Sequence, residues 1–319
     1  MRFRNPPGSP PQSAGLADFA PFFLRRARDR PPAVPEGHVL PAAEAAAALA
    51  AAGPESLTWL GHASFLIRTG GLTILTDPFL SDYAGPVPGL GPRRYVPPGI
   101  PLEELPKIDA VLISHNHYDH LDARSIERIS SNAKGAAVAV VPKGLGSFFA
   151  SRGYSDLREL GWGEGTLLGK SPSCSVSFSC LPCVHFSGRT PFDRNATLWA
   201  SWSIASPSLK LFFAGDSGYG PVFKETGARH GPFDLALLPI GAYEPASIMR
   251  PVHLDPEQAV AAGRDLGART LVAMHWGTIV LTDEPPFEPA RRFRAAADRA
   301  GFPAGRAWIM KIGETRETG

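Results

Sequence analysis

The sequence has few cysteines and no long apolar run, and both absences exclude classes of protein. Its thiols are Cys174, Cys180 and Cys183. Three thiols cannot all pair within one chain, which argues against a secreted disulfide scaffold. No apolar run approaches the roughly 18–20 residues of a membrane span, and the first residues lack the apolar core of a secretory signal. We therefore expect a cytoplasmic protein that does not cross a membrane, with association to a membrane surface left open.

A surplus of charge of one sign is missing as well. The 319 residues include 32 lysines and arginines against 30 aspartates and glutamates. Proteins that bind nucleic acid usually present a strongly basic face, so we expect no nucleic-acid partner. Glycine and proline are abundant, with 33 residues each. This content favours many turns and loops and disfavours a helical bundle.

Residues 1–55 differ in composition from the rest and are predicted to form an N-terminal arm. Within them the apolar run Phe19–Leu24 is followed by an arginine cluster at 25–30. Aromatic rings beside arginines suit a membrane interface. The alternative is an arm packed on the protein body with its arginines in water. The remaining residues, 56–319, are predicted to form one domain.

From residue 56 onward, short apolar runs alternate with turns. The runs typical of strands cover 57–60, 64–69, 72–76, 109–114, 136–141, 174–184, 209–214, 234–240 and 270–274. Helical patterns cover 122–131, 256–266 and 289–300, and an alanine-rich helix is expected at 42–52. Asp255 before Pro256 is typical of a helix start. This order of elements suggests two sheets packed together with helices outside.

The main chemical signal is a dense cluster of histidines directly after the apolar run 109–114. It contains His115, His117, Asp119 and His120. Imidazoles in a His-x-His spacing can converge on one metal ion, and the next two ligands are offset so that they can bind a second. Imidazole and carboxylate both suit Zn²⁺. A polar turn with incidental histidines is the alternative, and the density of ligand types disfavours it.

Three further candidate ligands each follow an apolar strand. They are His185, Asp216 and His275. Taken singly, each could simply cap a loop. Together with the first cluster they make five histidines and two aspartates, enough for two ions with Asp216 as a bridging carboxylate. Because ligands spread from His115 to His275 must converge on one site, they favour a single domain.

These motifs resemble those of a known family. The His-x-His-x-Asp-His pattern is similar to the signature of the metallo-β-lactamase fold, and the chain as a whole resembles the N-acyl-phosphatidylethanolamine-hydrolysing phospholipase D family. The segments that carry the resemblance are Trp59–Ala63, Leu75–Pro78, Ile113–Asp122, Leu198–Ser203, Phe212–Tyr219, Gly231–Asp234, Pro239–Pro245, His253–Glu257 and His275–Thr278. They cover roughly residues 56–285, and the last three are more specific to this branch than the histidine motif.

The resemblance implies an αββα four-layer sandwich with two zinc ions per chain at one sheet edge. The implied ligand sets are His115, His117 and His185 for one ion, Asp119, His120 and His275 for the other, and Asp216 as the bridge. It also implies a phospholipid substrate, N-acyl-phosphatidylethanolamine, cleaved to N-acylethanolamine and phosphatidic acid. A peripheral membrane habit is implied as well, and a homodimer is compatible with the resemblance. The sequence departs from the family's animal members at 246–251 and matches weakly before residue 56, where lipid contacts are expected.

Further roles follow for residues around the ligands. His253 is the best candidate for a catalytic residue that is not a ligand, mainly on the resemblance. It would donate a proton to the leaving oxygen or hold a phosphoryl oxygen, with packing before the next helix as the alternative. Asp119 would orient the attacking water in addition to binding metal. Asp77 and Asp122 are expected to hydrogen-bond ligand imidazoles and fix their tautomers, with a simple Asp-Pro turn as the alternative for Asp77.

Several aromatic side chains flank these motifs. His62 is expected to face the cleft, while Tyr118, Tyr243 and Trp276 could line an apolar channel or belong to the core. Three functional readings stay open at this point: the phospholipase-D-type phosphodiesterase, another metal-dependent hydrolase (a lactonase, β-lactamase or other phosphodiesterase), and a binding module without catalysis. The complete ligand set counts against the third.

Overall fold

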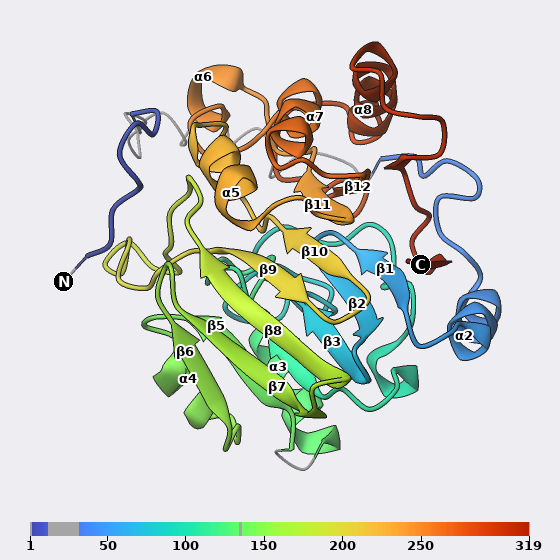
Figure 1. Cartoon of the computed structure of the whole chain (residues 1–319), viewed down its shortest axis with the longest axis vertical. Helices are drawn as coiled ribbons and strands as arrows, with labels where there is room; N and C mark the ends of the chain where they lie inside the picture. The colour runs from blue at the N-terminus through green and yellow to red at the C-terminus, as the bar shows by residue number, and fades with distance from the viewer. Residues whose placement is uncertain (1, 12–31, 134–135, 319) are drawn as a thin grey trace.

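The apolar runs of the sequence build two mixed β-sheets that pack face to face (Figure 1). The structure is a computed structural model and describes residues 2–11, 32–133 and 136–318. In the first sheet the order is β14 (Thr315–Glu317), β1 (Ser56–Gly61), β2 (Ser64–Thr69), β3 (Leu72–Thr76), β4 (Ala110–Leu112), β5 (Val138–Pro142) and β6 (Leu157–Leu160). In the second it is β13 (Ala307–Trp308), β12 (Thr270–Met274), β11 (Leu235–Pro239), β10 (Lys210–Phe213), β9 (Ser201–Ala205), β8 (Cys174–Leu181) and β7 (Gly165–Ser171).

Helices cover the outer faces of both sheets. They are α2 (Ala42–Ala51), the 3₁₀ turn η1 (Leu102–Glu104), α3 (Ala123–Asn132), α4 (Gly146–Ala150), α5 (Val222–His230), α6 (Ala246–Met249), α7 (Pro256–Asp265) and α8 (Glu288–Arg299). Asp255 caps α7 with Pro256 in its first turn, as the sequence predicted. The layers are therefore helix, sheet, sheet and helix, which confirms the predicted αββα sandwich.

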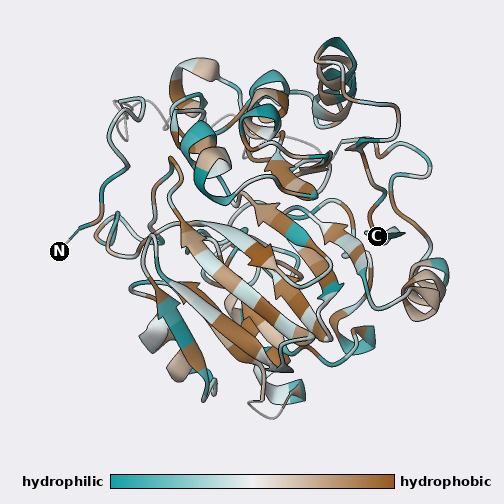
Figure 2. Ribbon diagram, viewed as in Figure 1, coloured by the Kyte–Doolittle hydropathy of each residue, from teal (hydrophilic) through white to brown (hydrophobic). Residues whose placement is uncertain are grey.

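Two apolar cores hold these layers together. The larger core joins inward side chains of both sheets, such as Phe65 and Phe178, and extends under α7 and α8. The smaller core lies between the first sheet and its helices and includes Val111 of β4 and Ile126 of α3. Figure 2 shows the corresponding concentration of hydrophobic residues in the strands. Strand β8 buries Val176, Phe178 and Cys180 in alternation, as expected for a strand with one buried face.

Strand direction decides where the loops meet. In the first sheet β1 and β3 both pair antiparallel with β2, and β4 pairs parallel with β3. In the second, β8 and β10 both pair antiparallel with β9, and β11 and β12 continue parallel to β10. Strands β1, β3 and β4 thus end at one edge of the first sheet, and β8, β10 and β12 end at one edge of the second. Loops that follow these strands can gather there.

The N-terminal prediction is only partly covered by the described residues. Ala45 and Leu49 of α2 are buried in the smaller core, and Phe3 packs against the larger one. The apolar and arginine clusters at 19–30 lie outside the described residues, so their membrane role stays a prediction, as does the division at residue 55. None of the described helices has the length and apolar character that crossing a bilayer requires.

Candidate metal centre

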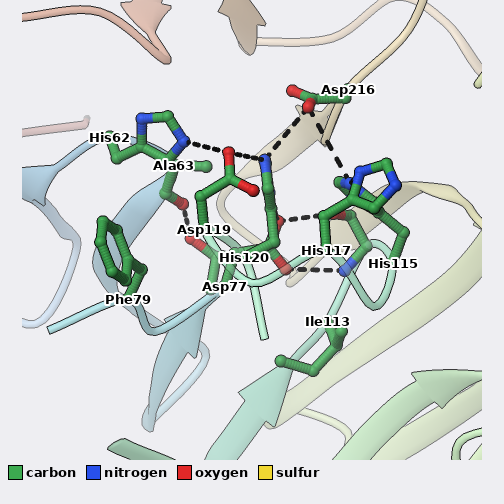
Figure 3. Close-up of polar contacts among 12 residues, drawn as sticks. His62, Ala63, Asp77, Phe79, Ile113, His115, His117, Asp119, His120 and Asp216 are labelled. Atoms are coloured by element: carbon green, nitrogen blue, oxygen red, sulfur yellow. Dashed lines mark hydrogen bonds and ion pairs between the residues drawn. The ribbon is translucent and has the colours of Figure 1, made fainter. Parts of the chain in front are cut away.

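The candidate ligands gather at the edge where the strands named above end. His115, His117, Asp119 and His120 lie on the loop after β4, and the other loops carry His185, Asp216 and His275. Figure 3 shows the close approach of the first cluster to Asp216, together with His62 and Asp77, which follow β1 and β3. Residues up to 213 positions apart in the chain, His62 and His275, are therefore brought to one place, because parallel strands end on the same side of a sheet.

A first group consists of three imidazoles. The Nε2 atom of His115 lies 2.7 Å from Nδ1 of His117, and Nε2 of His185 lies 3.3 Å from the same Nδ1. Their ligand nitrogens are mutually close enough to share one metal ion. Nitrogen lone pairs that face one another at these distances repel unless a cation or a proton lies between them.

A second group combines imidazoles with a carboxylate. The Oδ2 atom of Asp119 lies 3.6 Å from Nε2 of His120 and 3.5 Å from Nε2 of His275. The two Nε2 atoms are 3.2 Å apart. His62 joins this group, because its Nε2 lies 2.9 Å from Asp119 Oδ2. The ligand atoms of this group lie close enough together to hold a metal ion.

Asp216 stands between the two groups. Its Oδ2 atom lies 3.1 Å from His120 and 3.2 Å from His275 on one side. On the other side it lies 3.9 Å from His115 and 3.8 Å from His185. Its Oδ1 atom is buried and has no hydrogen-bond partner among the described residues. A carboxylate in this position has one oxygen within reach of both groups, as a bridging ligand requires.

Burial sets the charge state of the first group. The pKa values of His115 and His185 lie well below the usual range for imidazole, and that of His117 falls to about 4, in each case mainly because burial disfavours the charged ring. These rings are neutral at pH 7. Neutral imidazole is the form that binds a metal ion.

In the second group, nearby carboxylates raise the imidazole pKa values that burial would lower. Burial alone would lower the pKa of His275, but Asp216 and Asp119 raise it to about 9. Asp216 and Asp119 likewise hold the pKa of His120 well above its usual range against the effect of burial. In turn, His275 and His120 keep the pKa of Asp216 well below its usual range. Without metal, protons supply the positive charge that the two carboxylates need.

These observations fit a bound metal better than a structural polar cluster. Imidazole nitrogens and carboxylate oxygens are ligands that Zn²⁺ accepts, and they converge here in buried positions with a partnerless carboxylate oxygen. The described groups are therefore able to bind metal. Which residue binds which ion stays a prediction, but the structure brings all seven predicted ligands together.

Outer contacts orient the rings. Asp77 is fully buried, and its Oδ2 lies 2.7 Å from Nδ1 of His120, while its Oδ1 accepts the Ser114 backbone N–H at 2.7 Å. The Nδ1 of His185 lies 2.9 Å from the carbonyl oxygen of Val252. Such bonds hold the proton on Nδ1 and leave Nε2 free for a metal. Asp77 thus has the contact that the sequence analysis expected of it.

Asp122 was expected to hydrogen-bond a ligand imidazole, and the structure shows different partners. Its carboxylate accepts hydrogen bonds from the backbone N–H groups of Ser81 and Arg124 and from the Ser125 hydroxyl. It caps the N-terminus of α3, and none of its described contacts involves an imidazole. The reason is geometric: Asp122 begins the helix after the cluster, so its side chain turns back to the first free N–H groups of α3.

His253 and His62 lie beside the proposed ligands. Nδ1 of His253 is 3.9 Å from Asp216 Oδ2, and within the described part of the chain it has no hydrogen-bond partner. His62 was expected only to face the cleft, yet it contacts Asp119 directly. The signal available in the sequence was its place just after a strand, the same place that the recognised ligands occupy.

The flanking aromatic residues divide between cavity and core. Trp276 lines a small cavity together with His62 and His275, and it also stacks on Trp59 in the core. Tyr118 is covered by the guanidinium of Arg189. Tyr243 is buried, and Arg292 lies over its ring. Packing therefore accounts for most of their contacts.

Comparison with known proteins agrees with this geometry. Residues 73–276 match the Beta-lactamase superfamily domain. An N-acyl-phosphatidylethanolamine-hydrolyzing phospholipase D of Caenorhabditis elegans is 38% identical over 248 residues, which are 76% of this chain and 69% of that protein. An uncharacterized protein of Mycobacterium tuberculosis is 42% identical over 248 residues. That alignment covers 76% of this chain but only 64% of the mycobacterial protein.

Solved structures show the same fold. A metallo hydrolase from Ignicoccus hospitalis superposes with a TM-score of 0.60 at 21% identity, over 82% of this chain and 97% of that one. At this identity the likeness speaks for the fold alone. The family match, the relatives and the convergent histidines and aspartates point the same way: the chain belongs to the metallo-β-lactamase-fold hydrolases.

Proposed function

We propose that the protein is a dinuclear-zinc phosphodiesterase that hydrolyses N-acyl-phosphatidylethanolamine-type lipids to N-acylethanolamine and phosphatidic acid. The observation that carries the proposal is the position of Asp216, whose Oδ2 lies within 4 Å of both ligand groups. The 38% identity to a nematode protein of that named activity supports the choice of substrate.

The residues present would hold two ions. His115, His117 and His185 would bind one, and Asp119, His120 and His275 the other, with Asp216 between them. When bound, two Zn²⁺ ions supply an activated water and neutralise charge that develops on phosphorus. The chain itself supplies the orientation: Asp77 and the Val252 carbonyl fix the directions of two of the rings.

Other side chains handle the proton and the substrate. In the reaction the water oxygen forms a bond to phosphorus, the P–O bond to the N-acylethanolamine oxygen breaks, and that oxygen takes up a proton. His253, whose Nδ1 lies 3.9 Å from Asp216 Oδ2, would hold a proton near the leaving oxygen or hydrogen-bond a phosphoryl oxygen. Asp119, whose side chain is 14% exposed, would orient the water.

An exposed aromatic ring supports a lipid substrate. Phe192 lies on the loop that follows His185, and 86% of its surface is exposed to water. A ring exposed to this degree is available for contact with an apolar partner. A membrane surface next to the metal centre would cover the ring and bring phosphodiester groups to the site. The same ring would have no role with a small soluble lactone.

Product analysis with vesicles tests the proposal. Vesicles that contain N-acyl-phosphatidylethanolamine are incubated with zinc-loaded protein, and the products are identified by mass spectrometry. Release of N-acylethanolamine and phosphatidic acid in equal amounts is the expected result. If the protein leaves the lipid intact but opens a soluble lactone, a β-lactam or a cyclic phosphodiester, the lipid substrate is wrong. The protein would then be another metal-dependent hydrolase, the alternative given by the sequence.

Metal analysis tests whether the centre holds two zinc ions. Protein saturated with zinc and freed of excess ion should contain about two zinc ions per chain. An Asp216→Asn variant should lose bound metal and activity together. A wild-type content near one ion, or full activity of the variant, contradicts a dinuclear centre.

A further inference from the structure

The N-terminal segment lies against the loop that carries His185. The backbone N–H of Phe3 donates to the carbonyl oxygen of Asn195 at 2.9 Å, and the guanidinium of Arg2 donates to the Phe192 carbonyl at 3.1 Å. In Figure 1 the dark-blue segment runs beside the loop between β8 and β9. These residues precede the region 73–276 that matches the family.

Asn5 makes the contact that reaches the metal centre. Its side-chain oxygen accepts the backbone N–H of His185 at 3.0 Å and the indole N–H of Trp199 at 2.9 Å. Both donors belong to residues that are almost completely buried. The Trp199 N–H has a second acceptor, the carbonyl oxygen of Cys183, at 3.2 Å. A buried N–H without an acceptor is costly, so Asn5 strongly stabilises this arrangement of the loop.

The loop that carries His185 is held by contacts outside the strand pairings. Strand β8 ends at Leu181 and β9 begins at Ser201, so His185 lies on a loop. On this loop the N–H of Val184 donates to the Ser217 hydroxyl at 3.0 Å, and its carbonyl oxygen accepts the Gly218 N–H at 2.7 Å. The ring is fixed through Nδ1 to the Val252 carbonyl, 2.9 Å away. Asn5 adds a contact to the backbone of His185 itself, and this contact helps to define where Nε2 lies.

We infer that Asn5 is a positioning residue for the metal ion bound by His115, His117 and His185. This inference rests on the proposed dinuclear centre. Without the Asn5 oxygen, the His185 backbone shifts toward another acceptor and its Nε2 moves away from the other two imidazoles. One of the two ions is then bound more weakly, while the ion held by Asp119, His120 and His275 is unaffected.

Competition with a chromophoric zinc chelator tests the inference. Wild-type protein should show two binding steps. In Asn5→Ala one step should weaken about tenfold or more, the usual cost of losing an outer contact of a ligand, and the other should stay unchanged. Asn5→Asp keeps an acceptor oxygen in place and should restore wild-type binding. Arg4→Ala, a neighbouring exposed position without a described contact to the loop, is the matched control.

A purely structural role of Asn5 gives a different pattern. It would lower thermal stability in Asn5→Ala but leave both zinc steps at wild-type affinity, and that result overturns the inference. If Asn5→Ala does not fold, Asn5→Gln displaces the acceptor by one methylene and should weaken the same single step. A wild-type protein with fewer than two binding steps would instead contradict the proposed function itself.

Discussion

The Nε2 atom of His62 lies 2.9 Å from Oδ2 of Asp119, although 57 residues separate the two in the chain. Both side chains are at the strand-end edge of the first sheet, and both belong to the group that includes His120 and His275. The contact fixes the carboxylate that is predicted to bind metal and to orient water.

Replacing His62 by alanine should therefore weaken metal binding. The Asp119 carboxylate loses its partner and becomes free to rotate, so affinity at the position of His120 and His275 should fall about 10–100-fold. Isothermal titration of zinc into metal-free protein measures this. His230→Ala, at the far end of α5, controls for the loss of a histidine. Equal affinities of the His62 variant and wild type would show that the contact is dispensable.

Asp77 and Asp122 form a matched pair for separating ligand orientation from helix capping. Each is buried, and each accepts several hydrogen bonds. Asp77→Ala and Asp122→Ala should both lower the free energy of unfolding, by about 1–3 kcal/mol for each buried donor left unsatisfied. Only Asp77→Ala should lower zinc affinity, because only Asp77 contacts an imidazole. Urea unfolding and zinc titration are compared; a loss of zinc affinity in Asp122→Ala would contradict the assignment.

His253→Gln should separate catalysis from metal binding. The variant removes the imidazole that is placed to hold a proton, so kcat on vesicle substrate should fall about 10²–10⁴-fold. Zinc content should stay at the wild-type value, because the proposed ligands nearest to His253 are all retained. They are His115, His117, His185 and Asp216. Rapid-quench kinetics and metal analysis on the same preparation check both quantities. Loss of one zinc ion from the variant would make His253 a ligand instead.

Phe192→Ser should affect only membrane-bound substrate. Partial burial of a phenyl ring contributes on the order of 1 kcal/mol, so binding to vesicles should weaken about fivefold. Turnover of a short-chain, monomeric diester should be unchanged. Vesicle co-sedimentation and both assays are needed. Leu167→Ser is the control, since Leu167 is exposed on the edge strand β7; an equal effect of both variants would remove any special role of Phe192.

Acid should destabilise the metal-free protein. Mainly through burial, the pKa of His62 is lowered to about 3, and those of His117 and His253 to about 4. The unfolded chain, with imidazole pKa values near 6.5, therefore binds more protons between about pH 6.5 and 4. The free energy of unfolding must fall as pH falls through this window.

His275 acts in the opposite sense, but at higher pH. Its pKa of about 9 contributes stability that is lost as pH rises from about 6.5 to 9. Below pH 6 it is protonated in both states, so it does not offset the other rings. Urea unfolding in the presence of a chelator should therefore show a lower free energy of unfolding at pH 5 than at pH 7, by more than about 1 kcal/mol. Equal stability at the two values would contradict the burial of neutral imidazoles.

Local patterns determined a large part of this protein. Strands such as β2, β3 and β12 lie where the apolar runs predicted them, because each run buries its side chains whatever its partners are. The histidine motif at 115–120 predicted metal binding, since its candidate ligands are adjacent in the chain. The family resemblance supplied the αββα layering, which the structure confirms.

Only the tertiary structure decided which distant residues share the site. His62 reaches Asp119, and Asn5 reaches His185 across 180 positions; no local periodicity encodes either contact, because strand direction and sheet packing create both. Asp122 shows the converse. Its place beside the motif suggested an orienting role, yet the start of α3 turns its carboxylate toward free backbone N–H groups. The sequence was therefore sufficient to predict a metal site. Which residues lie next to the ligands depends on how the two sheets pack.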